Sequence, residues 1–163
     1  MTSQRIIVLG VGNILFSDEG FGIRVVEKLQ EVYEFPKNVS LVDGGVLGLN
    51  LLGVISEADH LLVVDAVRNN DRPGSLYRLE GEAIPNRVRA KNSLHQVDFL
   101  EALAMCQALD KVPETVILGV EPEDMETLSI KLTQTTLKKV DSMIAMILEE
   151  LDHLGISYRK RRN

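Results

Sequence analysis

The sequence predicts an α/β domain with a mostly parallel sheet covered by helices on both faces. Short apolar, β-branched runs alternate along the chain with longer segments of helical periodicity, as in sheets built with crossover helices. The runs lack the in–out alternation of half-exposed strands, which indicates strands buried on both faces. The 163 residues show no internal repeat and no linker, so we expect one domain over residues 1–158.

The first half of the chain contains three expected strands and two helices. An apolar run ending in glycine predicts a strand over 5–10, and helical spacing of apolar residues predicts a helix over 21–33. A second apolar run, closed by two glycines, predicts a strand over 39–43. A short helix is expected over 47–57, and a third strand, apolar until its acidic end, over 60–66.

The second half is expected to complete the sheet and its helical cover. Weak alternation after a Pro-Gly turn predicts an edge strand over 75–79. The polar stretch 80–92 is expected to be a loop that leads into a helix over 95–109. A buried strand is predicted over 115–120. A long amphipathic helix is expected over 135–154, where a glycine follows as its C-cap.

Composition and charge argue against nucleic acid as a ligand. Seven of the 163 residues are aromatic, and none is Trp, so stacking platforms for single strands are not expected. The net charge is −6, and residues 1–158 carry 14 basic against 24 acidic side chains, because four basic residues lie at 159–162. Such an acidic body repels phosphate backbones. The basic stretch 159–163 is expected to be a disordered, solvated tail.

Cysteine use and hydropathy favour a cytoplasmic protein that does not enter membranes. The single cysteine, Cys106, excludes an intramolecular disulfide and a CxxC motif. The apolar run at 6–9 ends in Gly10, Gly12 and Asn13, polar residues follow at 17–19, and no small-residue cleavage site appears. No stretch approaches the roughly 18 apolar residues of a membrane span.

Acidic residues follow three of the expected strands at their carboxyl ends. Asp18 and Glu19 come after the first strand, Asp43 closes the second, and Asp65 closes the third. Ligands of open α/β sheets bind at this end, and a carboxylate beside an apolar core is costly unless it is paired. Each Asp taken singly is also explained as a helix cap or a turn residue, and Asp43 before two glycines fits that explanation best.

Crowded carboxylates need a cation or a proton between them, so we considered the three histidines. His60 begins the strand that Asp65 ends, about 16 Å away, and cannot share a metal with it. His153, near the end of the last helix, is expected to be solvated. His95 follows a polar loop at the start of a helix, so Glu19, Asp65 and His95 form a candidate oxygen and nitrogen metal site.

Other sites fit the sequence less well. Gly10 and Gly12 begin a dinucleotide fingerprint, and Asp43 stands where a ribose-binding acid would, but Leu15 occupies the position of the third glycine. No P-loop and no GxSxG motif occurs. Cys106 lies in mid-helix among apolar residues, where a thiol is inert. We therefore expect neither a nucleotide cofactor nor a cysteine nucleophile.

Several motifs resemble the nickel–iron hydrogenase maturation endopeptidases. The first is the run Gly-Val-Gly-Asn-Ile-Leu-Phe-Ser-Asp-Glu-Gly-Phe-Gly at 10–22. Further matches, in order and at the spacing of that family, are Asp43-Gly44-Gly45, Gly48, Leu51-Leu52-Gly53, Asp59-His60-Leu61-Leu62, Asp65-Ala66, Pro73-Gly74, Ser93-Leu94-His95-Gln96 and Leu118-Gly119-Val120-Glu121-Pro122. The resemblance covers most of residues 5–155.

The resemblance implies a fold, an activity and a set of site residues. The fold would be a three-layer, five-stranded twisted sheet between helices, of the phosphorylase/hydrolase-like type. The activity would be removal of a C-terminal extension from a hydrogenase large-subunit precursor after nickel insertion, and the family is grouped with aspartic-type endopeptidases. Its metal ligands fall on Glu19, Asp65 and His95, and its Asp-Gly-Gly aspartate on Asp43. Nickel would arrive within the substrate, and zinc or cadmium could occupy the site in the isolated protein.

Some alternatives stay open at this stage. Nickel either serves for recognition or also polarises the scissile carbonyl or activates water. Asp43 orients the peptide, acts as a general base, or only caps its turn. A non-catalytic nickel-centre chaperone of the large subunit and a stand-alone metal-dependent peptidase or amidase are the rival functions. We expect a hydrogenase large-subunit precursor as the partner, and neither nucleic acid, membrane nor nucleotide.

Overall fold

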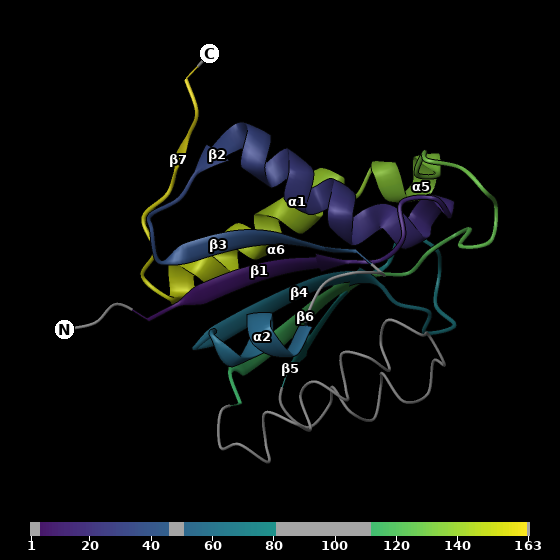
Figure 1. The fold of residues 1–163 in the computed structure, drawn as a ribbon. Coiled ribbons are helices and arrows are strands. Elements are labelled where there is room, and N and C mark those ends of the chain that lie inside the picture. Colours follow the sequence, from purple (N-terminus) through teal and green to yellow (C-terminus); the bar gives the residue numbers. More distant parts are fainter. Residues whose placement is uncertain (1–3, 46–50, 81–111, 163) are drawn as a thin grey trace.

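The computed structural model describes residues 4–45, 51–80 and 112–162, and a five-stranded sheet runs through its centre (Figure 1). The strand order is β3-β1-β4-β6-β5, and all neighbours are parallel except β5 and β6. The strands are β1 (Ile6–Val11), β3 (Val39–Gly45), β4 (His60–Ala66), β5 (Leu76–Glu80) and β6 (Glu114–Val120). The predicted mostly parallel five-stranded sheet is therefore confirmed, with the 75–79 segment at its edge.

Helices cover both faces of the sheet, as expected. On one face, α1 and α6 bury their apolar stripes against even-numbered positions of β1 and β4. On the other face, Ile55 of α2 packs with odd-numbered positions of the same strands. This division follows from the two-residue period of side chains along a strand. The helices are η1 (Ser17–Gly20), α1 (Phe21–Val32), α2 (Leu51–Ser56), α5 (Gln134–Leu137) and α6 (Val140–His153).

The last predicted helix differs from the structure, because it is two helices. α5 ends at Leu137, and α6 begins at Val140. The side chain of Thr133 caps α5, and Thr136 is buried where it donates a hydrogen bond to Asp18. This contact fixes α5 to the loop that follows β1, while α6 packs on the core. Leu137 consequently stays half exposed instead of joining the apolar stripe.

The basic C-terminal segment is ordered where we expected a disordered tail. Arg159–Lys160 form β7, which pairs antiparallel with β2 (Tyr33–Glu34) directly after α1. Ion pairs join Glu34 to Arg159 at 2.7 Å and to Arg161 at 3.4 Å. The prediction is therefore wrong for these residues. Its error was to treat the basic charges as solvated, although an acidic partner lies at the end of α1.

Several predictions concern residues outside the described part of the chain. They are the loop over 80–92, the helix over 95–109 with His95 and Cys106, and the start of the helix over 47–57. Within the part that the structure describes, no helix has the length and apolar character needed to cross a membrane.

Candidate functional site

The predicted acidic positions lie at the same end of the sheet. In the strand register, Gly10 of β1 lies between Asp43 of β3 and Val64 of β4, and Asp65 is the next residue along β4. Parallel strands end at one edge of the sheet, so their last residues share it. The register confirms the expectation that Asp43 and Asp65 lie at this end of the sheet.

Glu19 is held against the end of β4 by close glycine packing. A Cβ atom on Gly22 would lie 2.1 Å from the carbonyl oxygen of Val64, and one on Gly12 would lie 1.8 Å from that of Glu19. Only glycine allows these approaches, and Gly12 also has φ +133°. The turn that carries Glu19 therefore rests on the strand ends next to Asp65.

The two carboxylates of this pair have different surroundings. Burial raises the pKa of the Glu19 carboxyl above its usual range, because desolvation penalises the charged form. Asp65 is almost completely buried at 3% exposure, and its Oδ1 accepts a hydrogen bond from the N–H of Ala66 at 2.8 Å. Each of these partly or fully buried carboxylates provides hard oxygen donors for a cation.

Asp43 and Asp65 lie on different strands and on opposite faces of the sheet. The backbones of β3 and β4 flank β1, and two interstrand spacings amount to about 10 Å. Alternation places Asp43 on the face of Val39 and Leu41, toward α1 and α6, whereas Asp65 shares the α2 face with Val63. Asp43 therefore projects from the face of the sheet opposite to that of Asp65.

Asp43 has an exposed carboxylate with one structural contact. Its Oδ1 accepts a hydrogen bond from the N–H of Gly45 at 3.0 Å, which is the turn-capping role considered from the sequence. No hydrogen bond from another described residue reaches its Oδ2. One oxygen of this exposed carboxylate is thus held in place by the turn.

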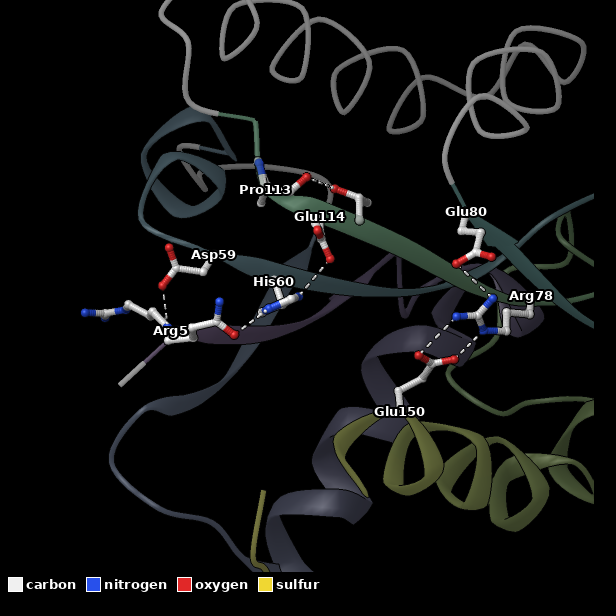
Figure 2. A network of polar contacts seen from close by, with 10 residues as sticks. Arg5, Asp59, His60, Arg78, Glu80, Pro113, Glu114 and Glu150 are labelled. Carbon is white, nitrogen blue, oxygen red and sulfur yellow. Dashed lines mark hydrogen bonds and ion pairs between the residues drawn. The ribbon is translucent and has the colours of Figure 1, made fainter. Parts of the chain in front are cut away.

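The described histidines lie away from the carboxyl ends of the strands. Figure 2 shows His60 at the amino end of β4, where Nε2 is 2.8 Å from Oε1 of Gln4 and Nδ1 is 3.6 Å from Oε2 of Glu114. The prediction that His60 cannot join Asp65 is confirmed. His153 is exposed in the last turn of α6, as expected.

The structure describes two of the three residues in the predicted metal site. His95 lies outside the described residues, so the set of Glu19, Asp65 and His95 stays a prediction. Among the described residues, no group of three or more His, Cys, Asp or Glu side chains forms a metal centre. The donor chemistry of Glu19 and Asp65 suits a divalent ion that also receives a nitrogen ligand.

Asp18 is a structural residue that the sequence analysis grouped with the exposed carboxylates. It is fully buried, and its oxygens accept hydrogen bonds from the N–H groups of Glu123, Asp124 and Thr133 at 2.8–3.1 Å. The hydroxyls of Thr133 and Thr136 also donate to it. Asp18 therefore ties the Glu19 turn to the segment after β6. Because Asp18 and Glu19 are adjacent acidic residues, the sequence does not reveal the structural role of Asp18.

Glu121 plays the corresponding role for the loop that follows Asp65. It is 4% exposed, and its Oε1 accepts hydrogen bonds from the N–H groups of Asn69 and Asp71 and from the Tyr77 hydroxyl at 2.6–3.1 Å. In the sequence, Glu121 stands within the family-like motif at 118–122. The signal that could have found it is an acidic residue directly after a buried strand.

Comparisons with known proteins agree with this architecture. A family model described as "HycI: Hydrogenase maturation protease" matches residues 23–150. The hydrogenase expression/formation protein HupD of Thiocapsa roseopersicina is 39% identical over 99% of this chain and 74% of its own length. The hydrogenase 2 maturation protease of Escherichia coli strain K12 is 37% identical over 94% of both chains.

Solved structures show the same fold. The hydrogenase maturating endopeptidase HybD from E. coli superposes with a TM-score of 0.91 and 36% identity, over 96% of this chain and 98% of that one. Fold and site define an α/β protein with carboxylates gathered where its parallel strands end. The chain belongs to the hydrogenase maturation protease family.

Proposed function

We propose that this protein is an endopeptidase that removes the C-terminal extension of a nickel–iron hydrogenase large-subunit precursor after nickel has been inserted. The observation that carries the proposal is the close packing of the Glu19 turn against the strand end that carries Asp65, in a chain that belongs to this family. The names of the relatives, maturation protease and maturating endopeptidase, support the same activity. A cytoplasmic location is part of the proposal.

Glu19, Asp65 and His95 would bind the nickel centre that the substrate brings. Carboxylate oxygens repel each other without a cation, so a precursor that lacks nickel would dock with this repulsion uncompensated. A docking difference of roughly 3 kcal/mol between loaded and empty precursor gives more than 100-fold discrimination. Zinc or cadmium would occupy the same ligands in the isolated protein.

Asp43 would act on the peptide and not on the metal. Its place on the opposite face from Asp65, with one oxygen held by Gly45, supports this division. In this role it orients the peptide or accepts a proton from the attacking water, consistent with the grouping of the family with aspartic-type endopeptidases.

The test is processing of purified large-subunit precursor in metal-free buffer. We expect a mass decrease equal to the extension when the precursor holds nickel, and none when it holds only its iron centre. Binding of the loaded precursor without a mass decrease would instead identify a nickel-centre chaperone. Efficient cutting of the nickel-free precursor would refute the nickel checkpoint.

A further inference from the structure

Strand β3 lies at the edge of the sheet, so every second residue directs its backbone N–H and C=O groups away from β1. Ile6 donates a backbone hydrogen bond to the carbonyl of Asn38 at 2.9 Å, and Ile6 pairs with Val39 in the parallel register. In a parallel pair, alternate residues of one strand bond to the same neighbour. Because Asn38 faces β1, the N–H and C=O groups of Leu41 and Asp43 face the open edge of the sheet.

In the part of the chain that the structure describes, no strand pairs with this edge of β3. The side chain of Gln30 donates a long hydrogen bond, 3.4 Å, to the carbonyl of Leu41, so α1 lies beside the first half of the strand. Among the described residues, none accepts a hydrogen bond from the N–H of Leu41 or of Asp43. The N–H groups of Leu41 and Asp43 belong to residues two apart along β3. This is the spacing at which a further strand forms hydrogen bonds.

The other edge of the sheet shows what a protected edge looks like. β5 carries Arg78 and Glu80, which form an ion pair at 3.1 Å, and Arg78 also pairs with Glu150 of α6 (Figure 2). Charged side chains of this kind prevent unwanted strand pairing. On β3, Pro36 and Lys37 come before the strand, and Asp43 is the one ionisable residue within it.

We infer that the open edge of β3 at Leu41–Asp43 binds the C-terminal extension of the precursor as an added, extended strand. This inference rests on the proposed function and names its mode of substrate binding. Strand addition obtains affinity from main-chain hydrogen bonds, so it accepts extensions of varied sequence. The added strand would pass beside the exposed Asp43 carboxylate.

The position of this edge favours the extension over other occupants. Leu41 and Asp43 lie at the end of the sheet where Glu19 and Asp65 lie. A strand added to β3 would lie three interstrand spacings, about 14 Å, from the backbone of β4. About four to five extended residues can bridge this gap. One substrate can therefore place its metal at Glu19 and Asp65 and its extended segment along β3.

Residue-resolved amide hydrogen exchange tests the inference on the full-length protein with an excess of nickel-loaded precursor. We expect the amides of Leu41 and Asp43 to exchange at least about tenfold more slowly with precursor. The amides of Ser40 and Val42 already bond to β1 and serve as internal controls. Unchanged exchange at both Leu41 and Asp43 overturns the inference, whether or not the precursor is cut. Protection of both without cutting supports it and refutes the proposed function.

The variant Leu41→Pro gives a second test through kinetics. Proline is tolerated on an edge strand where its missing N–H faces outward, so β3 should still pair with β1. Slow exchange at Ser40 and Val42 in the variant verifies this pairing. We expect KM for the loaded precursor to rise about tenfold, as for a lost hydrogen bond and a blocked strand. An unchanged KM in the folded variant overturns the inference.

Discussion

Thr136 donates a hydrogen bond from its hydroxyl to Oδ1 of Asp18 at 2.6 Å, although 118 residues separate them along the chain. Both side chains are fully buried. The bond connects the turn after β1 with the helix that precedes α6. It shows that Asp18 holds the turn, whereas its neighbour Glu19 has the metal-binding role that we propose.

Replacing Asp18 should therefore destabilise the whole domain. Asp18→Ala leaves at least three backbone N–H groups and two hydroxyls without their acceptor, and we expect a loss of about 3 kcal/mol or more in the free energy of unfolding. Urea denaturation measures it. Asp124→Ala, in an exposed turn of the same segment, is the control and should cost much less. Equal losses would show that Asp18 is an ordinary turn residue.

Substitution of Gly22 should disturb the packing of the Glu19 turn and α1 against the ends of β1 and β4. A Cβ at Gly22 meets backbone oxygens of two strands, which side-chain movement cannot relieve, so Gly22→Ala should cost at least about 2 kcal/mol. Gly155→Ala is the matched control, because its φ of +74° is unfavourable for alanine but nothing lies within 4 Å. Its cost should be about 1 kcal/mol. Thermal unfolding that ranks the two in the reverse order would contradict the packing argument.

Glu19→Gln should raise stability near neutral pH and lower activity. The folded-state pKa of Glu19 is raised by burial, so its charged form opposes folding at any pH above that pKa. The amide removes this penalty, and the gain in Tm should shrink as the pH falls through the folded pKa and vanish below the unfolded pKa. Cleavage of nickel-loaded precursor should weaken at the same time. A Tm difference that grows toward acid pH would have the wrong sign.

Divalent ions should bind the isolated protein through Glu19, Asp65 and His95. Calorimetry with nickel, zinc or cadmium should show binding that His95→Ala abolishes, because an imidazole completes a mixed oxygen and nitrogen set. His60→Ala is the control, since His60 lies at the opposite end of β4 beside Glu114. Unchanged affinity after His95→Ala would remove this residue from the site.

Local sequence patterns predicted the sheet because the strands' own apolar residues indicate that the strands are buried. The runs at 6–9 and 61–64 are apolar without interruption, and the structure buries all of them. The division of α5 from α6 depends instead on Thr136 reaching Asp18, a contact between distant segments that periodicity does not contain. The β2–β7 pair likewise depends on Glu34 meeting Arg159.

The sequence predicted at which end of the sheet the candidate site lies, but not which of its residues share a face of the sheet. Acidic residues after apolar strands indicated the correct end of the sheet for Glu19, Asp43 and Asp65. The sequence did not reveal that Asp43 lies on the other face from Asp65, because this depends on where each strand begins in its alternation. Nor did it reveal that Asp18 is buried.

The separation of Asp43 from Asp65 is a fixed distance that the substrate has to match. Interstrand spacing is set by backbone hydrogen bonds, so no side-chain change alters the distance of about 10 Å between these strands. On the proposed roles, the precursor must match this length between its nickel centre and the bond that is cut. Inserting one residue there shifts the bond by about 3.3 Å. Precursors of different families of hydrogenase would then be sorted by length before any side chain is compared.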